Sequence, residues 1–518
     1  MLVNGFLENS AARRPDKVAL ICGPDRLTYR DLNAAADRLA AALVRRGTAR
    51  HDRVIIFMDN SVEAVIALFG ILKAGCAFII VHAAMKARKL NYIIKDSGAS
   101  ALIAHSDKAG VVDAALIGCD GVRNLIWVPG DIQPTDPKYL ESALCLSWAA
   151  LLNKSESKLA ERQSRNIDQD IAAIIYTSGS TGEPKGVVSA HCNMVAAVRS
   201  ITTYLENIEE DVILNALPLS FDYGLYQVLM AVAFGGTVVL ERSFSFPYKI
   251  METLQRERVT GFPIVPTMIA MLLQMEDLSI FDLSSLRYIS NTAAALPVAH
   301  IKKMQALFPQ VKIFSMYGLT ECKRVSYLPP EYLNTKPGSV GIPIPNEEVF
   351  IVDESGREVG TKEIGELVVR GANVMRGYWN APQATEKVFR AGSRFGEVLL
   401  YTGDLFRRDE EGFLYFVARK DDMIKCRGER ISPREIENII CELDGVAEAA
   451  VIGVPDEFLG NAIQAYVVKR KNAKITENDV IKFCSKNLEP FMVPKSVTFL
   501  EAFTKTPSGK IDKKQLRC

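Results

Sequence analysis

Apolar and polar residues alternate at helical spacing between Leu27 and Arg46. Because residues three and four positions apart lie on the same face of an α-helix, this spacing predicts a helix with one apolar side. Thr28 is followed three positions later by Asp31, an acidic variant of the capping box that begins many helices. The sequence therefore predicts a helix that begins near residue 29. Its apolar positions include Leu32, Ala35, Leu39, Ala42 and Leu43.

Short apolar runs alternate with helical stretches along the first third of the chain. Such runs are typical of buried strands, whereas the stretch from Ser61 to Lys73 has helical character. Alternating strands and helices predict α/β layers around mainly parallel sheets. The predicted strands are Arg53 to Met58, Ala101 to Ala104, Leu125 to Val128 and Ala172 to Tyr176.

The chain has 518 residues, too many for one ordinary hydrophobic core, so two or more domains are expected. The stretch from Asn153 to Gln169 is polar, lacks apolar periodicity and predicts an exposed connection. A second change occurs between Ala418 and Asp422, where the apolar GFLYFVA gives way to the charged ARKDD. A boundary at this point predicts an N-terminal domain of residues 1–418 and a C-terminal domain of residues 419–518.

The charges nearly cancel, with 62 Lys plus Arg against 61 Asp plus Glu. The chain therefore lacks the excess of positive charge that is typical of a dedicated nucleic-acid-binding protein. The cysteines form no CxxC pair and no Cys/His cluster at zinc-ligand spacing, so we expect reduced thiols and a cytoplasmic protein. The N-terminus does not resemble a secretory signal. The longest apolar run, Val228 to Leu240, is shorter than the roughly 20 residues that span a bilayer, so we expect a soluble enzyme.

A loop of small, hydroxyl-bearing residues with one lysine follows the predicted strand AAIIY. Glycines let such a loop approach a polyphosphate closely, while N–H and hydroxyl groups donate to phosphate oxygens and the lysine supplies charge. It is not a Walker A loop, because Pro184 precedes Lys185 and Gly186 follows it. A solvent-exposed turn is the alternative for the loop considered alone. The predicted nucleotide contacts in it are Thr177, Ser178, Gly179, Ser180, Thr181, Gly182 and Lys185.

The string TSGSTGEPKG, from Thr177 to Gly186, resembles a motif of the adenylate-forming superfamily, which groups acyl-CoA synthetases, adenylation domains of nonribosomal peptide synthetases and luciferases. The resemblance extends over essentially the whole chain. It implies an enzyme that uses ATP and Mg²⁺ to convert a carboxylic acid to its acyl-AMP and then passes the acyl group to a thiol. It also implies an α/β fold, in which a large N-terminal domain of layered subdomains is joined by a hinge to a small α+β C-terminal domain.

The segment from Ser315 to Glu321 is similar to the superfamily's adenine and phosphate segment. By this resemblance the Tyr317 ring stacks on adenine, with Gly318 beside it. The Thr320 hydroxyl contacts the phosphate, and Glu321 holds Mg²⁺. A flat ring for a base, a hydroxyl for a phosphate oxygen and a hard carboxylate for magnesium each suit the implied contact.

Two further motifs complete the implied nucleotide site. Tyr401 to Asp404 resembles the YTGD motif, whose aspartate accepts both ribose hydroxyls, and Arg419 matches the arginine that joins it. Lys510 matches the lysine of the C-terminal PxGK motif, which enters the active site during adenylation. Its ammonium can bridge the substrate carboxylate and the α-phosphate, where negative charge develops. The predicted catalytic residues are therefore Lys510, Thr320 and Glu321.

The resemblance also implies residues that act after adenylation. Asp421 occupies the position of the hinge residue about which the C-terminal domain rotates. Lys425 and Gly428 lie in the segment that lines the tunnel for the incoming thiol after this rotation. Without the resemblance, charged residues in a linker are more often simply solvated.

Asp222 lies where amino-acid-activating members of the superfamily carry an aspartate that binds the α-ammonium of the substrate. A carboxylate aimed at an ammonium forms a charge-assisted bond, so Asp222 favours an amino acid. Capping of the following helix is the alternative role. The chain resembles stand-alone prolyl carrier-protein ligases, which makes L-proline the lead substrate. The predicted acid pocket consists of Asp222, Tyr223, Tyr226, Pro263, Met316, Arg324 and Val325.

The acceptor thiol is expected to come from another molecule, because no carrier motif follows Lys510. The leading hypothesis is the phosphopantetheine of a separate carrier protein. The alternative is an acyl-CoA synthetase that activates a fatty or aryl acid and uses free coenzyme A. A luciferase-type oxidase would share the adenylation step but is rarer. A non-enzymatic binding protein is disfavoured because Lys510, Glu321 and Asp404 are all present.

Overall fold

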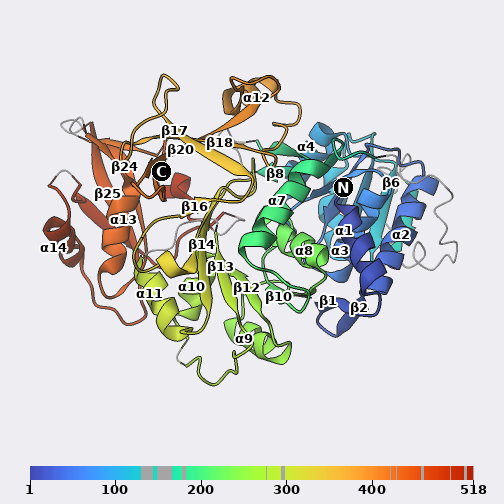
Figure 1. Cartoon of the computed structure of the whole chain (residues 1–518), viewed down its shortest axis with the longest axis horizontal. Helices are drawn as coiled ribbons and strands as arrows, with labels where there is room; N and C mark the ends of the chain where they lie inside the picture. Colours follow the sequence, from blue (N-terminus) through green and yellow to red (C-terminus); the bar gives the residue numbers. More distant parts are fainter. Residues whose placement is uncertain are drawn as a thin grey trace.

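The computed structural model shows a molecule of layered helices and sheets with the C-terminal part at one end (Figure 1). The fold matches the predicted α/β class, with a large N-terminal part and a smaller C-terminal unit. The described residues are 1–129, 144–148, 166–177, 183–275, 277–292, 298–420, 422–426, 429–456, 460–490, 492–506 and 510–516.

A seven-stranded sheet and its helices are built from the N-terminal part of the chain. The elements are β3 (Arg53–Phe57), β4 (Ala77–Ile80), α4 (Ala87–Ser97), β5 (Ala101–His105), η1 (Ser106–Lys108), α5 (Ala109–Ala115), β6 (Asn124–Val128), β7 (Leu144–Ser147), β8 (Ile171–Thr177) and β9 (Lys185–Ala190). The strand order is β7-β6-β5-β3-β4-β8-β9, and only the β8–β9 pair is antiparallel. Leu90 of α4 and Val112 of α5 share a buried cluster with Ile55 and Phe57 of β3, so these helices cover one face.

A nine-stranded sheet forms the second layer. Its strands are β1 (Val18–Cys22), β2 (Asp25–Thr28), β10 (Val212–Asn215), β11 (Thr237–Leu240), β12 (Gly261–Ile264), β13 (Tyr288–Asn291), β14 (Lys312–Tyr317), β15 (Ser326–Leu328) and β16 (Ile342–Pro343). The order is β16-β15-β14-β13-β12-β10-β11-β1-β2. The central strands are parallel, and the antiparallel pairs lie at the two edges.

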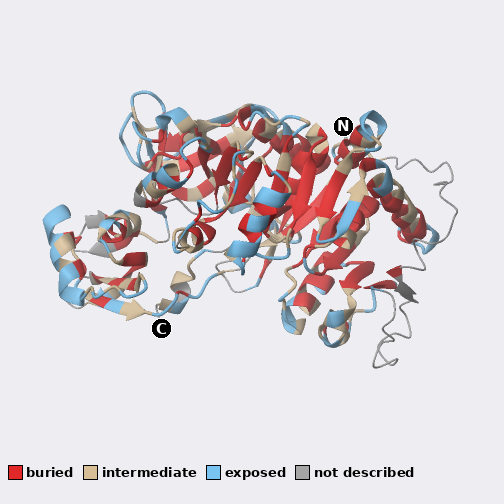
Figure 2. Ribbon diagram, turned by 90° about the horizontal axis from the view of Figure 1, so that it is seen from below, coloured by how far each residue is buried: buried red, intermediate tan, exposed pale blue. Residues whose placement is uncertain are grey.

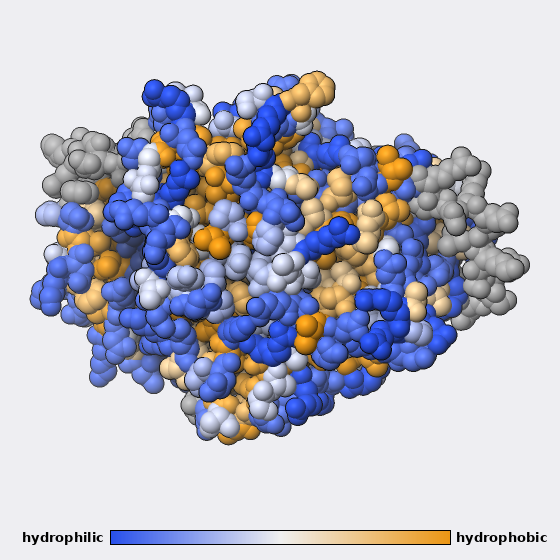
Figure 3. All heavy atoms as spheres, viewed as in Figure 1, coloured by the Kyte–Doolittle hydropathy of each residue, from blue (hydrophilic) through white to orange (hydrophobic). Residues whose placement is uncertain are grey.

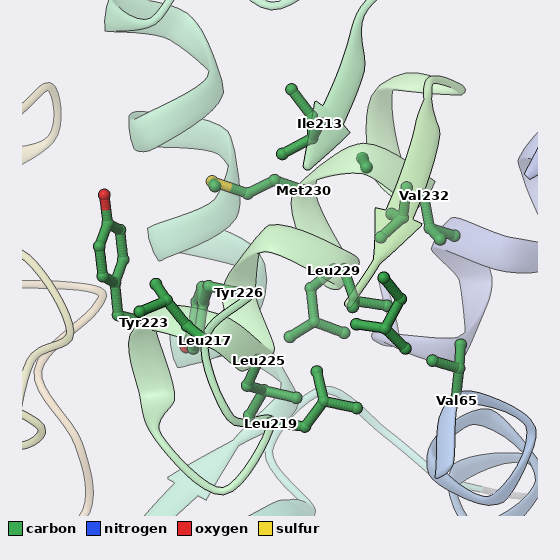
Figure 4. Packing of buried hydrophobic residues seen from close by; sticks show 14 of the residues in the cluster. Val65, Ile213, Leu217, Leu219, Tyr223, Leu225, Tyr226, Leu229, Met230 and Val232 are labelled. Carbon is green, nitrogen blue, oxygen red and sulfur yellow. The ribbon is translucent and has the colours of Figure 1, made fainter. Parts of the chain in front are cut away.

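One large hydrophobic cluster joins the two sheets through the helices between and around them. These helices are α1 (Asn4–Arg13), α2 (Tyr29–Arg45), α3 (Val62–Lys73), α7 (His191–Tyr204), α8 (Asp222–Phe234), α9 (Pro247–Arg256), α10 (Pro266–Leu272), α11 (Val298–Leu307) and η3 (Pro330–Tyr332). The cluster contains Ile56 of β3 and Leu214 of β10. Figure 4 shows part of it, to which α8 contributes Leu225, Leu229 and Met230. The helix α8 is buried along its length and is therefore a rigid support for residues at its first turn.

A third, five-stranded sheet is antiparallel and has its own buried cluster. Its elements are β17 (Glu347–Val352), β18 (Gly365–Gly371), α12 (Pro382–Val388), β19 (Phe389–Ala391), β20 (Val398–Arg408) and β21 (Leu414–Arg419). The order is β17-β18-β20-β19, and β21 also pairs with β20. This sheet brings β20 and β21 next to the end of β14, where the candidate site lies.

The C-terminal unit combines short sheets with two helices. Its elements are β22 (Ile424–Cys426), β23 (Glu429–Ile431), α13 (Pro433–Glu442), β24 (Val446–Asp456), β25 (Gly460–Lys469), α14 (Glu477–Asn487), β26 (Ser496–Leu500) and η4 (Lys513–Leu516). β24, β25 and β26 form one sheet, and β22 pairs with β23. Ile436, Val451 and Val480 belong to a separate buried cluster in this unit. In Figure 2 the unit lies at the left end of the molecule, with buried residues inside it.

The local predictions agree closely with these elements. α2 begins at Tyr29, and Thr28 and Asp31 form the predicted capping box, in which Asp31 N donates to Thr28 Oγ1 at 3.1 Å. β3, β5, β6 and β8 coincide with the predicted strands to within one residue at each end, and α3 follows Ser61 as its cap. Of the predicted exposed connection, only its last residues are described. β21 ends at Arg419, one residue past the predicted domain boundary, which stays a prediction.

Polar residues cover much of the face seen in Figure 3, with apolar residues in small groups between them. Among the described helices, none is long and apolar enough to span a bilayer. The large apolar residues of the described chain are mostly inside the buried clusters. The apolar character of α8 therefore reflects burial between the sheets.

Candidate active site

Two sheets bring the predicted adenine and ribose residues together. Tyr317 ends β14 and Asp404 lies within β20, and the Tyr317 hydroxyl donates a hydrogen bond of 2.5 Å to Oδ2 of Asp404. Arg419 on β21 is the direct cross-strand neighbour of Asp404, and its Nε lies 3.3 Å from Oδ1. An aromatic ring, a carboxylate and a guanidinium therefore form one contiguous group.

The buried Asp404 carboxylate has an oxygen that could accept a further hydrogen bond. The residue is only 7% exposed, and burial raises its pKa, while Arg419 and the hydrogen bond from Tyr317 act in the opposite direction. Oδ1 accepts no hydrogen bond from the part of the chain that the structure describes. A buried oxygen without a donor is costly, so a ligand hydroxyl at this point would be stabilising. This chemistry fits the ribose contact predicted for Asp404.

Two glycines are required by the backbone of this site. Gly403 has φ of 70°, a left-handed conformation that L side chains rarely adopt, and its N–H donates to Glu366 Oε1 at 3.0 Å. A Cβ on Gly318 would lie 2.6 Å from the carbonyl oxygen of Lys323. Gly318 therefore allows the turn after β14 to fold back on itself. This turn carries Thr320, which is half-buried, next to Glu321.

Tyr378 connects the predicted magnesium ligand with the lysine of the phosphate loop. Its hydroxyl donates a hydrogen bond of 2.7 Å to Oε1 of Glu321. Nζ of Lys185 lies 5.4 Å from the centroid of the same ring, close enough for a cation–π contact. Burial and the nearby Glu321 carboxylate raise the pKa of Tyr378, which keeps it a neutral donor. Sequence reasoning gave Tyr378 no role, because nothing in the sequence separates it from a core aromatic residue.

The base of the predicted phosphate loop is a hairpin. β8 and β9 pair so that Thr177 lies opposite Lys185, and both residues are half-buried. The backbone therefore holds the two ends of the loop side by side. The intervening predicted contacts Ser178, Gly179, Ser180, Thr181 and Gly182 lie outside the described residues.

Lys510 belongs to the C-terminal unit, and its backbone N–H donates to Thr506 Oγ1 at 3.2 Å. The residue is exposed, yet the surrounding protein lowers its pKa by desolvation, while Asp404, Asp222 and Glu321 raise it. These three carboxylates belong to the predicted ribose, acid and magnesium subsites. An ammonium among carboxylates at this position is able to neutralise charge that develops on a phosphate and a substrate carboxylate.

The residues predicted to act after adenylation are described only in part. Asp421 and Gly428 lie outside the described residues. Lys425 lies in β22, opposite Arg430 of β23, but its side chain is outside the described part. Their roles as hinge and tunnel residues stay predictions.

Buried side chains from α8 and the neighbouring strands form the predicted acid pocket. Tyr223, on the first turn of α8, donates a hydrogen bond of 2.7 Å to the carbonyl of Ser290. Pro263 of β12 is buried and is the register neighbour of Ser290 on β13. The Arg324 guanidinium carbon lies 5.2 Å from the centroid of the Tyr223 ring. The strands β12 and β13, the helix α8 and the turn that carries Arg324 thus converge on this pocket.

Met316 completes the pocket on the side of β14. The Tyr204 hydroxyl lies 2.9 Å from its sulfur, and the Tyr204 ring stacks on Tyr327 with centroids 4.1 Å apart. Burial raises the pKa of Tyr204 to about 12, with Arg324 acting in the opposite direction. Val325 is buried and packs in the cluster of the five-stranded sheet, and its place in the acid pocket stays a prediction.

Lys323 is a pocket residue that sequence reasoning missed. Its Nζ lies 3.5 Å from Oδ2 of Asp222 and 4.5 Å from the centroid of the Tyr226 ring. Burial lowers the pKa of Lys323 to about 7, while Asp222 raises it. The sequence predicted that Asp222 meets a substrate ammonium, but the structure pairs it with an ammonium of the chain. Lysines are usually exposed, so only the adjacency to Arg324 could have pointed to Lys323.

The chemistry of the site fits a magnesium ion that is held mainly by nucleotide phosphates. Among the described residues, no group of three or more His, Cys, Asp or Glu is arranged to hold a metal. Glu321 offers one carboxylate, fixed by Tyr378, beside the phosphate loop. Mg²⁺ commonly takes one or two protein carboxylates plus phosphate oxygens and water. Glu321 is therefore the residue that would hold Mg²⁺, which would neutralise phosphate charge there.

These residues together define a site of the class that activates carboxylic acids with ATP. Comparison with protein families agrees. The model described as AMP-binding enzyme matches residues 7–379, and the model described as AMP-binding enzyme C-terminal domain matches residues 435–510. The chain belongs to the AMP-binding enzyme family.

Two curated relatives match the chain along almost its whole length. A long-chain-fatty-acid–CoA ligase of Bacillus subtilis is 31% identical over 534 residues, covering 99% of this chain and 94% of the relative. A 3-[(3aS,4S,7aS)-7a-methyl-1,5-dioxo-octahydro-1H-inden-4-yl]propanoyl:CoA ligase of Mycobacterium tuberculosis is 31% identical over 522 residues, covering 99% and 98%. Both relatives are CoA ligases by name.

Solved structures show the same fold. The anthranilate CoA ligase AuaEII in complex with anthranoyl-AMP has a TM-score of 0.90 and 26% identity, covering 100% of this chain and 96% of that one. ATP-bound MatB from Rhodopseudomonas palustris has a TM-score of 0.88 and 28% identity, covering 100% and 98%.

The chain is therefore an AMP-forming acid–thiol ligase that uses ATP, with Mg²⁺ as is general for the family. The predictions of superfamily, fold, enzyme class and co-substrate are confirmed. The predicted resemblance to prolyl carrier-protein ligases is not supported, because the relatives named here are CoA ligases. The comparisons favour the alternative, in which coenzyme A is the acceptor.

Proposed function

We propose that this enzyme converts a short carboxylic acid to its coenzyme A thioester through an acyl-AMP. The observation that carries the proposal is the group formed by Tyr317, Asp404 and Arg419, in which the Tyr317 hydroxyl donates to Asp404 at 2.5 Å and Arg419 Nε lies 3.3 Å from the same carboxylate. Tyr378 holds the Glu321 carboxylate through a hydrogen bond of 2.7 Å. Asp404 and Glu321 are the predicted ribose and magnesium ligands, and CoA ligases match 99% of the chain.

In the first proposed step an oxygen of the substrate carboxylate attacks the α-phosphorus of ATP, and pyrophosphate leaves with the broken P–O bond. Asp404 and Tyr317 hold the nucleoside end. Lys185 and Glu321, linked through Tyr378, lie on the phosphate side. Lys510 stabilises the negative charge that develops between carboxylate and phosphate.

In the second proposed step the sulfur of coenzyme A attacks the carbonyl carbon of the acyl-AMP, and AMP leaves. The relatives that match 99% of this chain are CoA ligases by name, which supports coenzyme A as the thiol. The resemblance to the superfamily implies that the C-terminal domain rotates between the two steps. A carrier protein is the acceptor that the test must exclude.

The burial of the side chains of the predicted acid pocket supports a short acid as the substrate. Tyr223 and Tyr226 are 1% exposed, Met316 and Lys323 are 3% exposed, and Arg324 is 1% exposed. These side chains of the predicted acid pocket and its wall are therefore packed in the protein interior. A long alkyl chain would need several of them to move out of a close-packed interior, which is costly.

The direct test is thioester formation from ATP, Mg²⁺ and a series of acids from acetate to palmitate, with coenzyme A or a phosphopantetheinylated carrier protein as the acceptor. Mass spectrometry of the products identifies both the acid and the thiol. We expect acyl-CoA with short acids and a decline with chain length. Palmitoyl-CoA as the main product would contradict the short-acid proposal, and acylation of the carrier protein alone would contradict the choice of acceptor.

A further inference from the structure

A buried ammonium and a buried carboxylate face each other in the wall of the predicted acid pocket. Nζ of Lys323 lies 3.5 Å from Oδ2 of Asp222, and their side chains are 2% and 9% exposed. The same Nζ lies 4.5 Å from the centroid of the Tyr226 ring and 5.6 Å from that of Tyr223. A carboxylate and two aromatic faces already surround this cation, as they would a bound ammonium ligand. The position that could receive a substrate ammonium is therefore filled from within the chain.

The backbone of Lys323 is held in an unusual conformation. Its φ of 70° lies in the left-handed region, which is uncommon for lysine. Its N–H donates to the carbonyl of Leu319 at 2.7 Å. The buried Asn373 amide donates to the carbonyls of Cys322 at 2.8 Å and Arg324 at 3.0 Å, one on each side of Lys323. Buried hydrogen bonds thus position this lysine, unlike a mobile surface lysine.

The charges of the pocket disfavour a further cation. Arg324 is 1% exposed, and no carboxylate of the described residues forms an ion pair with it within 4.0 Å. Lys323 and Arg324 are thus two buried basic residues, and Asp222 is the carboxylate that pairs with Lys323 among the described residues. A substrate ammonium would add a further positive charge beside the Arg324 guanidinium in a buried site, where like charges repel strongly.

Asp222 is the first residue of α8. By the resemblance stated above, this is the position that binds the α-ammonium of the substrate in amino-acid-activating members of the superfamily. The group on the carbon next to the substrate carboxylate is therefore the part of the substrate that would meet the Lys323–Asp222 pair.

We propose that Lys323 is a specificity-determining residue, which takes the cation position beside Asp222 and so makes the enzyme reject α-amino acids. This inference rests on the proposed function. The substrates are short acids whose α-carbon is unsubstituted or carries an uncharged group. Lys323 acts through Asp222 and the pocket charge, and it does not touch the reacting atoms.

The test compares acids in pairs that share a carbon skeleton and differ by an α-ammonium, such as propionate with alanine and 3-phenylpropionate with phenylalanine. ATP–pyrophosphate exchange gives kcat/KM for each member. We expect the wild type to favour the acid without ammonium by about 100-fold or more, because an uncompensated buried charge opposes the amino acid. In Lys323→Met the carboxylate of Asp222 lacks its partner. The ratio of kcat/KM for the acid without ammonium to kcat/KM for the amino acid should therefore fall at least about tenfold, because kcat/KM for the amino acid rises.

The chain offers a matched control. Lys336 lies 2.8 Å from Asp409 and 5.0 Å from the centroid of the Phe413 ring, so Lys336→Met removes a similar aspartate and ring pairing outside the pocket. This variant should keep the wild-type ratio. Lys323→Gln is the second variant if Lys323→Met does not fold, and Asp222→Asn in either background should abolish the gain with amino acids.

Two results would overturn the inference: a wild type that prefers the amino acid of a pair, or an unchanged ratio in a folded variant that lacks the Lys323 ammonium. Either result could occur while acyl-CoA is still formed. Failure of the proposed function is separate, because it would appear as the absence of any coenzyme A thioester with any acid.

Discussion

At the scale of single residues, the nucleotide site depends on contacts between motifs that are far apart in the sequence. Tyr317 and Asp404 belong to different motifs and different sheets, and each was predicted as a nucleotide contact. The hydrogen bond of 2.5 Å between them could not be predicted, because it depends on how two sheets meet. This bond fixes the ring and the carboxylate relative to each other.

Replacing Tyr317 by phenylalanine keeps the ring and removes this hydrogen bond. Hydrogen bonds to charged groups contribute about 1.5–3 kcal/mol, so we expect KM for ATP to rise by about 10-fold or more. Steady-state pyrophosphate exchange at varied ATP measures the effect. Tyr415→Phe is the control, because it removes a hydrogen bond of 3.2 Å to Asp409 outside the site. Equal effects of the two substitutions would refute a specific role for Tyr317.

Tyr378 orients the carboxylate that would hold magnesium. Tyr378→Phe removes the hydrogen bond of 2.7 Å to Glu321 and leaves the ring beneath Lys185. Loss of an outer hydrogen bond to a metal ligand commonly weakens metal binding by about 10–100-fold, so the Mg²⁺ concentration for half-maximal activity should rise. A titration of Mg²⁺ at saturating ATP measures this. An unchanged midpoint would show that Tyr378 contributes to side-chain packing and does not affect Mg²⁺ binding.

The acid pocket shows where prediction from the sequence fails. Asp222, Tyr223 and Tyr226 could be proposed as pocket residues because their segment resembles a motif of the superfamily. Lys323 was missed because its burial depends on strands and helices that meet only in the folded chain.

At the scale of elements, the predictions that succeeded rest on local interactions. The start of α2 is determined by Thr28 and Asp31, which bond within one helical turn. The strands β3, β5, β6 and β8 are apolar runs that need no distant information to be recognised. The strand order of the two large sheets could not be predicted, because pairs such as β1 with β11 join residues more than two hundred positions apart.

The helix α7 contains a further long-range contact with a consequence for stability. Its first residue, His191, is buried, and Nδ1 accepts a hydrogen bond of 3.1 Å from Val3 N. Burial lowers the pKa of His191 to about 4, below the ordinary value of 6.5. The unfolded chain therefore binds a proton between pH 6.5 and 4 that the folded chain does not, and stability should fall as pH falls through this window.

His191→Gln removes this titration. We expect the melting temperature of the wild type to decrease more steeply than that of the variant between pH 6.5 and 4. Thermal unfolding followed by circular dichroism at several pH values gives the two slopes. His51→Asn, at an exposed histidine, should retain the wild-type slope. Parallel curves for the wild type and His191→Gln would contradict the assignment.

At the scale of the whole molecule, the C-terminal unit contacts the five-stranded sheet. Its Ser432 hydroxyl donates to the carbonyl of Val417 at 2.6 Å, and Arg434 lies over the Phe416 ring with Cζ 5.0 Å from the centroid. These contacts join the unit to β21. The same unit carries Lys510, for which we propose a role in the first chemical step.

The most direct test of the proposed mechanism measures the two half-reactions, adenylation and thioester formation, separately in Lys510→Ala. Acid-dependent ATP–pyrophosphate exchange should fall by about 100-fold or more, because an ammonium that stabilises developing charge is lost. Thioester formation from supplied acyl-AMP and coenzyme A should stay near the wild-type rate. Lys505→Ala, which removes the nearby ion pair with Glu448 at 2.8 Å, is the control and should affect neither reaction strongly. Undiminished pyrophosphate exchange in Lys510→Ala would contradict the proposed role of this lysine and, with it, the proposed arrangement for adenylation.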